Sequence, residues 1–131
     1  KAGDVLGITI YAKYWVTLTN KIGFYFNFPI SPWYYWIKSK IIKSLYDKNT
    51  ICVELQAEPW GQKLLYDTPL QEQEKTMDLE QFKKNIFYAK STGLDTFYFW
   101  GAEWWYWLKE TQNMPEIWDE AKKVFLSNNV K

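Results

Sequence analysis

The sequence predicts an α/β fold with about three parallel strand-helix units, amounting to a partial (half) TIM barrel in one domain, 1–131. Short β-branched or aromatic runs alternate with amphipathic helical patterns, which indicates a parallel sheet with helical crossovers. One run ends in carboxylates and a tryptophan, and parallel folds place reactive groups at the carboxyl ends of strands. The chain has 131 residues, whereas a complete barrel has about 250.

The first unit begins with a β-branched run at residues 4–11, which predicts a strand. Residues 15–28 are rich in Val, Thr, Tyr and Phe around the turn-forming stretch 20–23, so an irregular hairpin or a long loop follows this strand. Ser31 is a suitable N-cap and Pro32 suits the first helical position. The predicted helix runs to about Asp47.

The apolar residues of this first helix recur every four positions, which predicts one stripe along it: Trp33, Ile37, Ile41 and Leu45. Residues 50–56 form the second predicted strand, and a polar loop covers residues 61–76. This unit therefore has the order helix, strand, loop.

The next helix has the clearest start signal in the chain. Asp78 is a predicted N-cap and Gln81 its reciprocal partner, while Gly93 is placed to end the helix. Its apolar stripe consists of Phe82, Ile86 and Ala89. Residues 96–100 predict a third strand, and Pro115 begins a last helix, whose stripe is Trp118, Ala121 and Phe125 with Ile117 and Val124 beside it.

The charged residues exclude several classes of partner. Sixteen Lys and 15 acidic residues are intermixed and give a net charge of +1, so no basic face predicts nucleic-acid binding.

No apolar run reaches the ~18 residues of a membrane span, so no membrane partner is expected. No signal peptide is visible and the compartment is left open. The first residue is Lys rather than Met, and an upstream segment is expected to be missing.

The absence of His and Arg restricts the chemistry. It excludes Ser-His and Cys-His nucleophile systems, histidine metal sites and bidentate arginine clamps. Cys52 is the single cysteine, so it forms no internal disulfide and reads as a small buried apolar residue. Catalysis would therefore rest on carboxylates, Tyr, Lys or amides, and no metal or organic cofactor is expected.

Aromatic residues make up 21% of the chain, including nine Trp and ten Tyr. This fraction exceeds what a core of this size requires, so some rings are expected to be exposed. Trp and Tyr suit stacking on the apolar faces of sugars, because they also carry a polar group. The alternative is that the rings pack the core and the helix contacts.

Three segments in order resemble strands six to eight of the retaining (β/α)8 glycoside hydrolases, the superfamily of cellulases, xylanases and β-galactosidases. They are residues 4–11, the stretch Val-Glu-Leu-Gln-Ala-Glu-Pro-Trp at 53–60, and Phe-Trp-Gly-Ala-Glu-Trp-Trp at 99–105. The resemblance spans nearly the whole chain and implies carbohydrate chemistry on a β-linked polysaccharide or oligosaccharide.

The resemblance also implies roles for particular residues. Glu54 matches the nucleophile at the end of the seventh strand, and Tyr11 matches a tyrosine that hydrogen-bonds and orients it. Trp100 matches the tryptophan beneath the cleaved sugar. Trp60, Trp104 and Trp105 would extend this platform.

Strand alternation supports the position of Glu54. If Glu54 faces the barrel axis, Cys52 and Gln56 face inward as well, while Ile51, Val53 and Leu55 face the helices. The alternative is that Glu54 is a solvated carboxylate at a strand end.

The chain departs from the family at the second catalytic group. Retaining hydrolysis needs two carboxyl groups about 5–5.5 Å apart, and the family's Asn-Glu acid/base pair is absent from this sequence. The acid/base is expected in a missing amino-terminal half-barrel, which leaves this chain incomplete as an enzyme. Glu58 and Glu103, both on predicted loops, are the substitute candidates.

Two other functions fit the same residues. A non-catalytic carbohydrate-binding module would use the aromatic rings without the carboxylate. A self-assembling half-barrel would bury them between the subunits of a homodimer.

Overall fold

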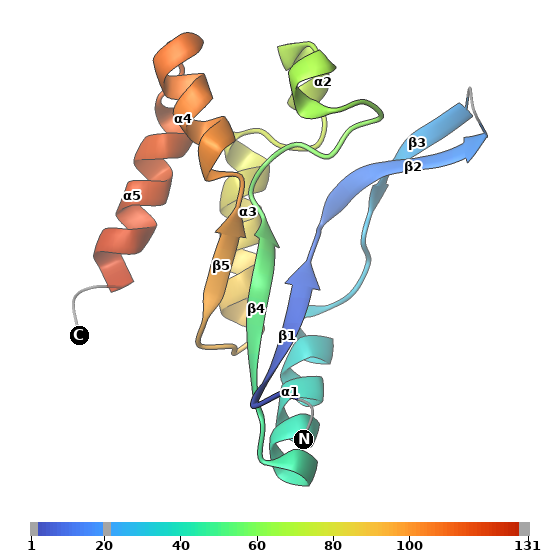
Figure 1. The fold of residues 1–131 in the computed structure, drawn as a ribbon, viewed down its shortest axis with the longest axis vertical. Coiled ribbons are helices and arrows are strands. Elements are labelled where there is room, and N and C mark those ends of the chain that lie inside the picture. Colours follow the sequence, from blue (N-terminus) through green and yellow to red (C-terminus); the bar gives the residue numbers. More distant parts are fainter. Residues whose placement is uncertain (1–2, 20–21, 129–131) are drawn as a thin grey trace.

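The computed structural model describes residues 3–19 and 22–128, which contain two separate sheets. β1 (Val5–Ile10), β4 (Asn49–Gln56) and β5 (Phe97–Trp100) form a parallel sheet in the order β1-β4-β5. β2 (Lys13–Thr19) and β3 (Ile22–Asn27) form an antiparallel pair that projects beyond the carboxyl end of β1 (Figure 1). The helices are α1 (Pro32–Tyr46), α2 (Leu70–Gln73), α3 (Leu79–Ser91), α4 (Ala102–Thr111) and α5 (Glu116–Asn128).

The predicted half TIM barrel is wrong: the chain is a small α/β domain. The strand after β1 does not continue a strand-helix unit but begins the antiparallel hairpin, which forms a sheet of its own. Alternating strands and helices predict a parallel sheet, but closing one into a barrel also requires a fixed strand tilt and stagger. Here the three-stranded sheet has the order β1-β4-β5 and remains open.

The hairpin and the individual parallel strands are confirmed. β1 falls within the predicted residues 4–11 and β5 within 96–100, while β2 and β3 span residues 13–27 where 15–28 was predicted. The turn residues Asn20 and Lys21, on which the hairpin prediction partly rested, lie outside the described residues.

The start of α1 follows the prediction. The Ser31 side chain accepts a hydrogen bond from the Trp33 backbone N–H, and Pro32 is the first helical residue. The predicted stripe of Trp33, Ile37, Ile41 and Leu45 faces outward instead of into the core, and all four side chains are exposed. Tyr35 is the buried residue of α1 and packs with the sheet.

The start of α3 is confirmed in part. The Asp78 carboxylate accepts from the Gln81 backbone N–H at 2.7 Å, but the Gln81 side chain donates to Asn85 rather than back to Asp78. The predicted stripe of Phe82, Ile86 and Ala89 is buried.

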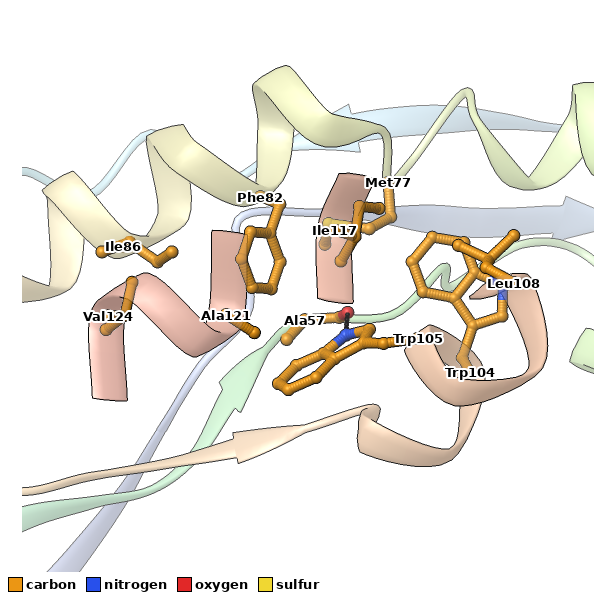
Figure 2. Packing of buried hydrophobic residues seen from close by; sticks show 10 residues of the cluster. All are labelled: Ala57, Met77, Phe82, Ile86, Trp104, Trp105, Leu108, Ile117, Ala121 and Val124. Atoms are coloured by element: carbon orange, nitrogen blue, oxygen red, sulfur yellow. Dashed lines mark hydrogen bonds between the residues drawn. The ribbon is translucent and has the colours of Figure 1, made fainter. Parts of the chain in front are cut away.

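The helix α4 was not predicted, and it completes the larger core. Trp104, Trp105 and Leu108 of α4 pack with residues of α3 and α5 and with the end of β4, as Figure 2 shows. The whole buried cluster consists of Ala57, Met77, Phe82, Ile86, Trp104, Trp105, Leu108, Ile117, Ala121 and Val124.

A register irregularity in β4 overturns the predicted alternation. Cys52 and Leu55 are three residues apart, yet both pack in the second core cluster, with Ile10, Tyr35, Ala89 and Leu94. The ladder to β1 shifts between Ile8 and Thr9, and the ladder to β5 shifts between Cys52 and Leu55. A bulge resets which side chains share a face, so Val53 is exposed rather than turned toward the helices.

One face of the parallel sheet is not covered by a described helix. α1 and α3 lie behind the sheet in the view of Figure 1, and the front of the strands is open. Val5, Val53, Tyr98 and Trp100 are between 40% and 59% exposed. We call these four residues the open-face patch. Parallel sheets normally have both faces covered.

Candidate functional site

The strongest candidate site lies where the parallel strands end. Tyr11 follows β1, Glu54 lies near the end of β4, and the Tyr11 hydroxyl donates to Glu54 Oε2 at 2.9 Å. The residues are 43 positions apart in sequence, and the parallel pairing of β1 with β4 brings them together. The structure therefore joins the two predicted catalytic residues.

Trp60 extends this pair into an aromatic wall. Its ring lies 5.0 Å from the Tyr11 ring in an edge-to-face arrangement. The Trp60 backbone is held from two sides, since its N–H donates to the Thr76 hydroxyl and its carbonyl accepts from the Trp15 N–H. Trp60 is itself partly exposed, so its ring is available to a ligand.

These residues line an open groove of about 750 Å³. The groove also takes rings from the hairpin region and from α1, and it carries one carboxylate, Glu54, and one amine, Lys38, among its described lining residues. Its aromatic residues are Tyr11, Tyr14, Phe28, Tyr34, Tyr35 and Trp60. Ligand sites in proteins commonly have about this volume and a mainly apolar lining with a few polar groups.

Gln56 holds the segment next to Tyr11 and was not predicted as a site residue. Its side chain is fully buried. The amide oxygen accepts from the backbone N–H groups of Ala12 and Lys13, at 2.9 and 3.0 Å, and the amide nitrogen donates to the Lys13 carbonyl at 2.6 Å. The chain leaving Tyr11 is therefore fixed to β4.

A second carboxylate, Glu58, lies at the same end of the sheet. The Trp100 indole N–H donates to Glu58 Oε1 at 2.9 Å. Burial raises the pKa of Glu58 above its ordinary value, the negative charge of Glu103 adds to this, and the Trp100 hydrogen bond opposes it. Glu58 therefore keeps its proton to higher pH than a solvated glutamate, as a general acid requires.

Gly101 sets the distance between these two strand ends. Its φ is +130°, and a Cβ built there would lie 2.6 Å from the Glu58 Cβ. An L side chain fits neither the backbone conformation nor the space. The glycine after Trp100 therefore permits the close approach of β5 to Glu58.

The charges of both glutamates act on Tyr11. Burial, the hydrogen bond to Glu54 and the charges of Glu54 and Glu58 all raise the pKa of Tyr11. The phenol therefore stays protonated through the neutral range and donates to Glu54 throughout it.

The remaining predicted site residues lie elsewhere. Glu103 is exposed in the first turn of α4. Trp104 and Trp105 are buried in the core, where their indole N–H groups donate to Gln73 Oε1 and to the Ala57 carbonyl. These two indoles are thus oriented by the core rather than presented to a ligand.

The groove residues from α1 and the hairpin were missed by sequence reasoning. Tyr14, Phe28 and Tyr34 gave no motif signal, and their placement depends on the fold. The start of the hairpin is held beside the sheet by the Gln56 side chain of β4, which bonds the backbone of Ala12 and Lys13, and by the Trp15 N–H, which donates to the Trp60 carbonyl. The sequence feature that pointed toward these residues is the high aromatic content near the predicted hairpin.

No group of three or more acidic or cysteine side chains suited to a metal ion occurs in the part of the chain that the structure describes. Within residues 3–19 and 22–128, no helix has the length and apolar character to cross a bilayer.

No family model, curated protein or solved structure matches this chain. The resemblance to retaining glycoside hydrolases therefore stays a prediction, carried by the residues quoted for it.

Proposed function

We propose that the groove binds a β-linked oligosaccharide and that Glu54 is placed to act as the nucleophile of retaining glycoside hydrolysis. The observation that carries the proposal is the Tyr11–Glu54 hydrogen bond in the lining of an aromatic groove. Exposed rings would stack on sugar faces. The Tyr11 hydrogen bond fixes the orientation of the Glu54 carboxylate.

In the proposed reaction, a Glu54 oxygen attacks the anomeric carbon while the glycosidic C–O bond breaks. The leaving oxygen takes a proton from an acid, and water then cleaves the glycosyl-enzyme ester and restores the Glu54 carboxylate. The chain's candidate acid is Glu58, because burial raises the pKa of Glu58 and because its charge contributes to the raised pKa of Tyr11.

The groove lining supports a second candidate function. Among its described residues Glu54 is the one carboxylate, and Glu58 is bonded to Trp100 outside that lining. A non-catalytic carbohydrate-binding site would have this composition. Because Glu58 lies outside the groove lining, the isolated chain is expected to show no hydrolysis of unactivated oligosaccharides, whichever of the two functions holds.

Binding is tested by calorimetric titration with a panel of β-linked gluco-, xylo- and manno-oligosaccharides. We expect Trp60→Ala to weaken the binding about tenfold, which corresponds to one stacked ring. Trp33→Ala is the matched control, since Trp33 is exposed on α1 outside the groove. No binding at millimolar sugar, or equal losses in both variants, would refute the proposal.

Glu54→Gln separates the two functions. A dinitrophenyl glycoside needs little acid assistance, so slow turnover is expected from the native chain and none from Glu54→Gln. Turnover unaffected by Glu54→Gln would exclude Glu54 as the nucleophile. Absence of turnover in both, with unchanged sugar binding, would favour the non-catalytic function.

A further inference from the structure

The outward face of α1 carries large apolar side chains in water. Trp33, Ile37, Ile41 and Leu45 recur every four residues and are between 41% and 67% exposed. We call these four residues the α1 stripe. The opposite side of the helix holds Tyr35, which is buried against the sheet. Apart from the Trp33 ring, which contacts Trp36 of the same helix, the structure gives the α1 stripe no aromatic contact, and its four side chains stay exposed within the described part of the chain.

Lysines border the α1 stripe on both sides. With 3.6 residues per turn, Lys38 falls on one flank and Lys40 on the other, while Lys43 lies on the far side of the helix from the stripe. The helix itself contains no acidic residue. Lys40 lies over the Trp36 ring at 5.8 Å, and Lys43 pairs with Asp47, the C-cap residue, at 2.7 Å in an exposed contact.

The neighbouring helix α3 adds to this positive side. α1 and α3 lie behind the same sheet (Figure 1), and Phe87 of α3 is exposed and lines a surface hollow with Pro32 of α1. Lys83, Lys84 and Lys90 accompany it, with Glu80 paired to Lys84. Together the two helices carry six lysines and one glutamate, whereas the whole chain has a net charge of only +1.

We propose that this face binds the surface of an anionic lipid bilayer, with α1 lying parallel to it. A helix with tryptophan and aliphatic residues on one side and lysines beside them suits the boundary between headgroups and acyl chains. Each lysine near an anionic membrane adds a favourable, salt-sensitive contribution. The expectation of no membrane partner rested on the lack of a spanning segment, and a surface-bound helix does not need one.

The charges favour a bilayer over a second copy of the chain. In a two-fold symmetric dimer, the same patch meets itself. The lysines that border one α1 stripe would then lie against the lysines of the other, with no acidic residue of α1 between them. An anionic surface meets the stripe and its lysines without that repulsion.

The test is sedimentation of the full chain with phosphatidylcholine vesicles and with vesicles containing 30% phosphatidylserine. We expect binding to the anionic vesicles at about 0.1 M salt and a steep loss at 1 M salt, where charges are screened within about 3 Å. Equal binding to neutral vesicles, or none to either, would overturn the proposal.

Two pairs of variants locate the contact. Leu45→Gln on α1 is matched by Leu126→Gln on α5, since both leucines are 67% exposed. The α1 double variant Lys40→Gln/Lys43→Gln is matched by the α5 double variant Lys122→Gln/Lys123→Gln. In each pair, one lysine lies over a tryptophan ring and the other forms an exposed ion pair.

We expect Leu45→Gln to weaken vesicle binding about tenfold and the α1 lysine pair to weaken it about fivefold, through the loss of Lys40, with both α5 variants unchanged. Equal losses in the α5 variants would overturn the proposal. So would a dimer in vesicle-free solution that Leu45→Gln dissociates, because the α1 stripe would then be an interface between copies. Binding of an acidic protein partner without vesicle binding would also overturn it.

Discussion

At the scale of single residues, the site depends on one buried amide as much as on its carboxylates. Gln56 satisfies two backbone N–H groups and one backbone carbonyl of the segment that follows Tyr11. A buried polar group left without its partner costs about 1–3 kcal/mol. The position of Tyr11, and through it the orientation of Glu54, rests on this contact.

We therefore expect Gln56→Ala to lower the free energy of unfolding by about 3 kcal/mol, measured by urea denaturation. Gln62→Ala is the control, because Gln62 is exposed and its loss should change stability by less than about 0.5 kcal/mol. If both variants behave alike, the amide of Gln56 does not hold the segment.

Glu58 gives a pH-dependent prediction. Its folded-state pKa is raised, mainly by burial, so the folded state holds this proton more tightly than the unfolded state. The contribution of Glu58 to stability is then full below its ordinary pKa and is lost as the pH rises through the raised value. The Glu58→Gln variant has no titrating group at this position, so its stability does not fall with rising pH for this reason.

The stability of Glu58→Gln relative to the native chain should therefore increase between pH 4 and pH 7, as followed by urea denaturation at each pH. Glu74→Gln, at an exposed position after α2, serves as the control. A relative stability that stays flat for Glu58→Gln, or that rises equally for Glu74→Gln, would show that Glu58 is not desolvated.

At the scale of elements, the connection between β5 and α4 brings Trp100 to Glu58. Gly101 has a φ of +130°, and its missing Cβ would lie 2.6 Å from the Glu58 Cβ and 2.9 Å from the Ala57 carbonyl. The strands would have to separate to admit a methyl group, because the nearest atoms include backbone.

We expect Gly101→Ala to cost about 3 kcal/mol of unfolding free energy. Gly61→Ala is the matched control, since no atom lies within 4 Å of a Cβ built at Gly61. Thermal and urea unfolding of the two variants give the comparison. Equal stability of the two would show that β5 tolerates the displacement.

The elements also show what the sequence can and cannot predict. α1 and α3 were placed well because Ser31 and Asp78 are side-chain caps, and both caps are present. α4 was missed because its N-cap is Gly101, which offers no side-chain hydrogen bond, and its tryptophans and tyrosine are residues common in strands. The α1 stripe was found by its spacing, but spacing does not tell which side of a helix meets the core.

For the site, the Tyr11–Glu54 pair was predicted from the resemblance to the glycoside hydrolases, and the two residues meet because the carboxyl ends of neighbouring parallel strands lie side by side. Gln56 could not be recognised in the same way. Gln56 bonds the backbone of residues 12 and 13, and the position of that backbone beside β4 depends on how the chain turns from β1 into the hairpin. The bulge in β4 likewise has no signature in the sequence, so alternation failed at Cys52, which packs on the helix side, and at Val53, which is exposed.

At the scale of the whole molecule, the chain exposes an unusually large surface. Its accessible area is 9104 Å², whereas a compact monomer of 15.8 kDa is expected to expose about 7300 Å². The difference of about 1800 Å² exceeds the ~800 Å² that each partner buries in a standard interface. The open-face patch of Val5, Val53, Tyr98 and Trp100 contains no charged residue and suits such an interface.

We therefore expect the chain to self-associate through the open-face patch, independently of the α1 stripe. Tyr98→Lys would place a charge on the β5 side of the patch, and in a symmetric dimer such charges would be buried in the interface. Tyr66→Lys is the control, because Tyr66 is a highly exposed tyrosine away from the sheet. In sedimentation velocity at about 50 μM, the native chain and Tyr66→Lys should be dimeric. The dimer dissociation constant of Tyr98→Lys should be at least about tenfold higher, since one buried charge costs several kcal/mol. A native chain that remains monomeric, or a dimer equally disrupted by Tyr66→Lys, would mean that the open-face patch is not where copies of the chain meet.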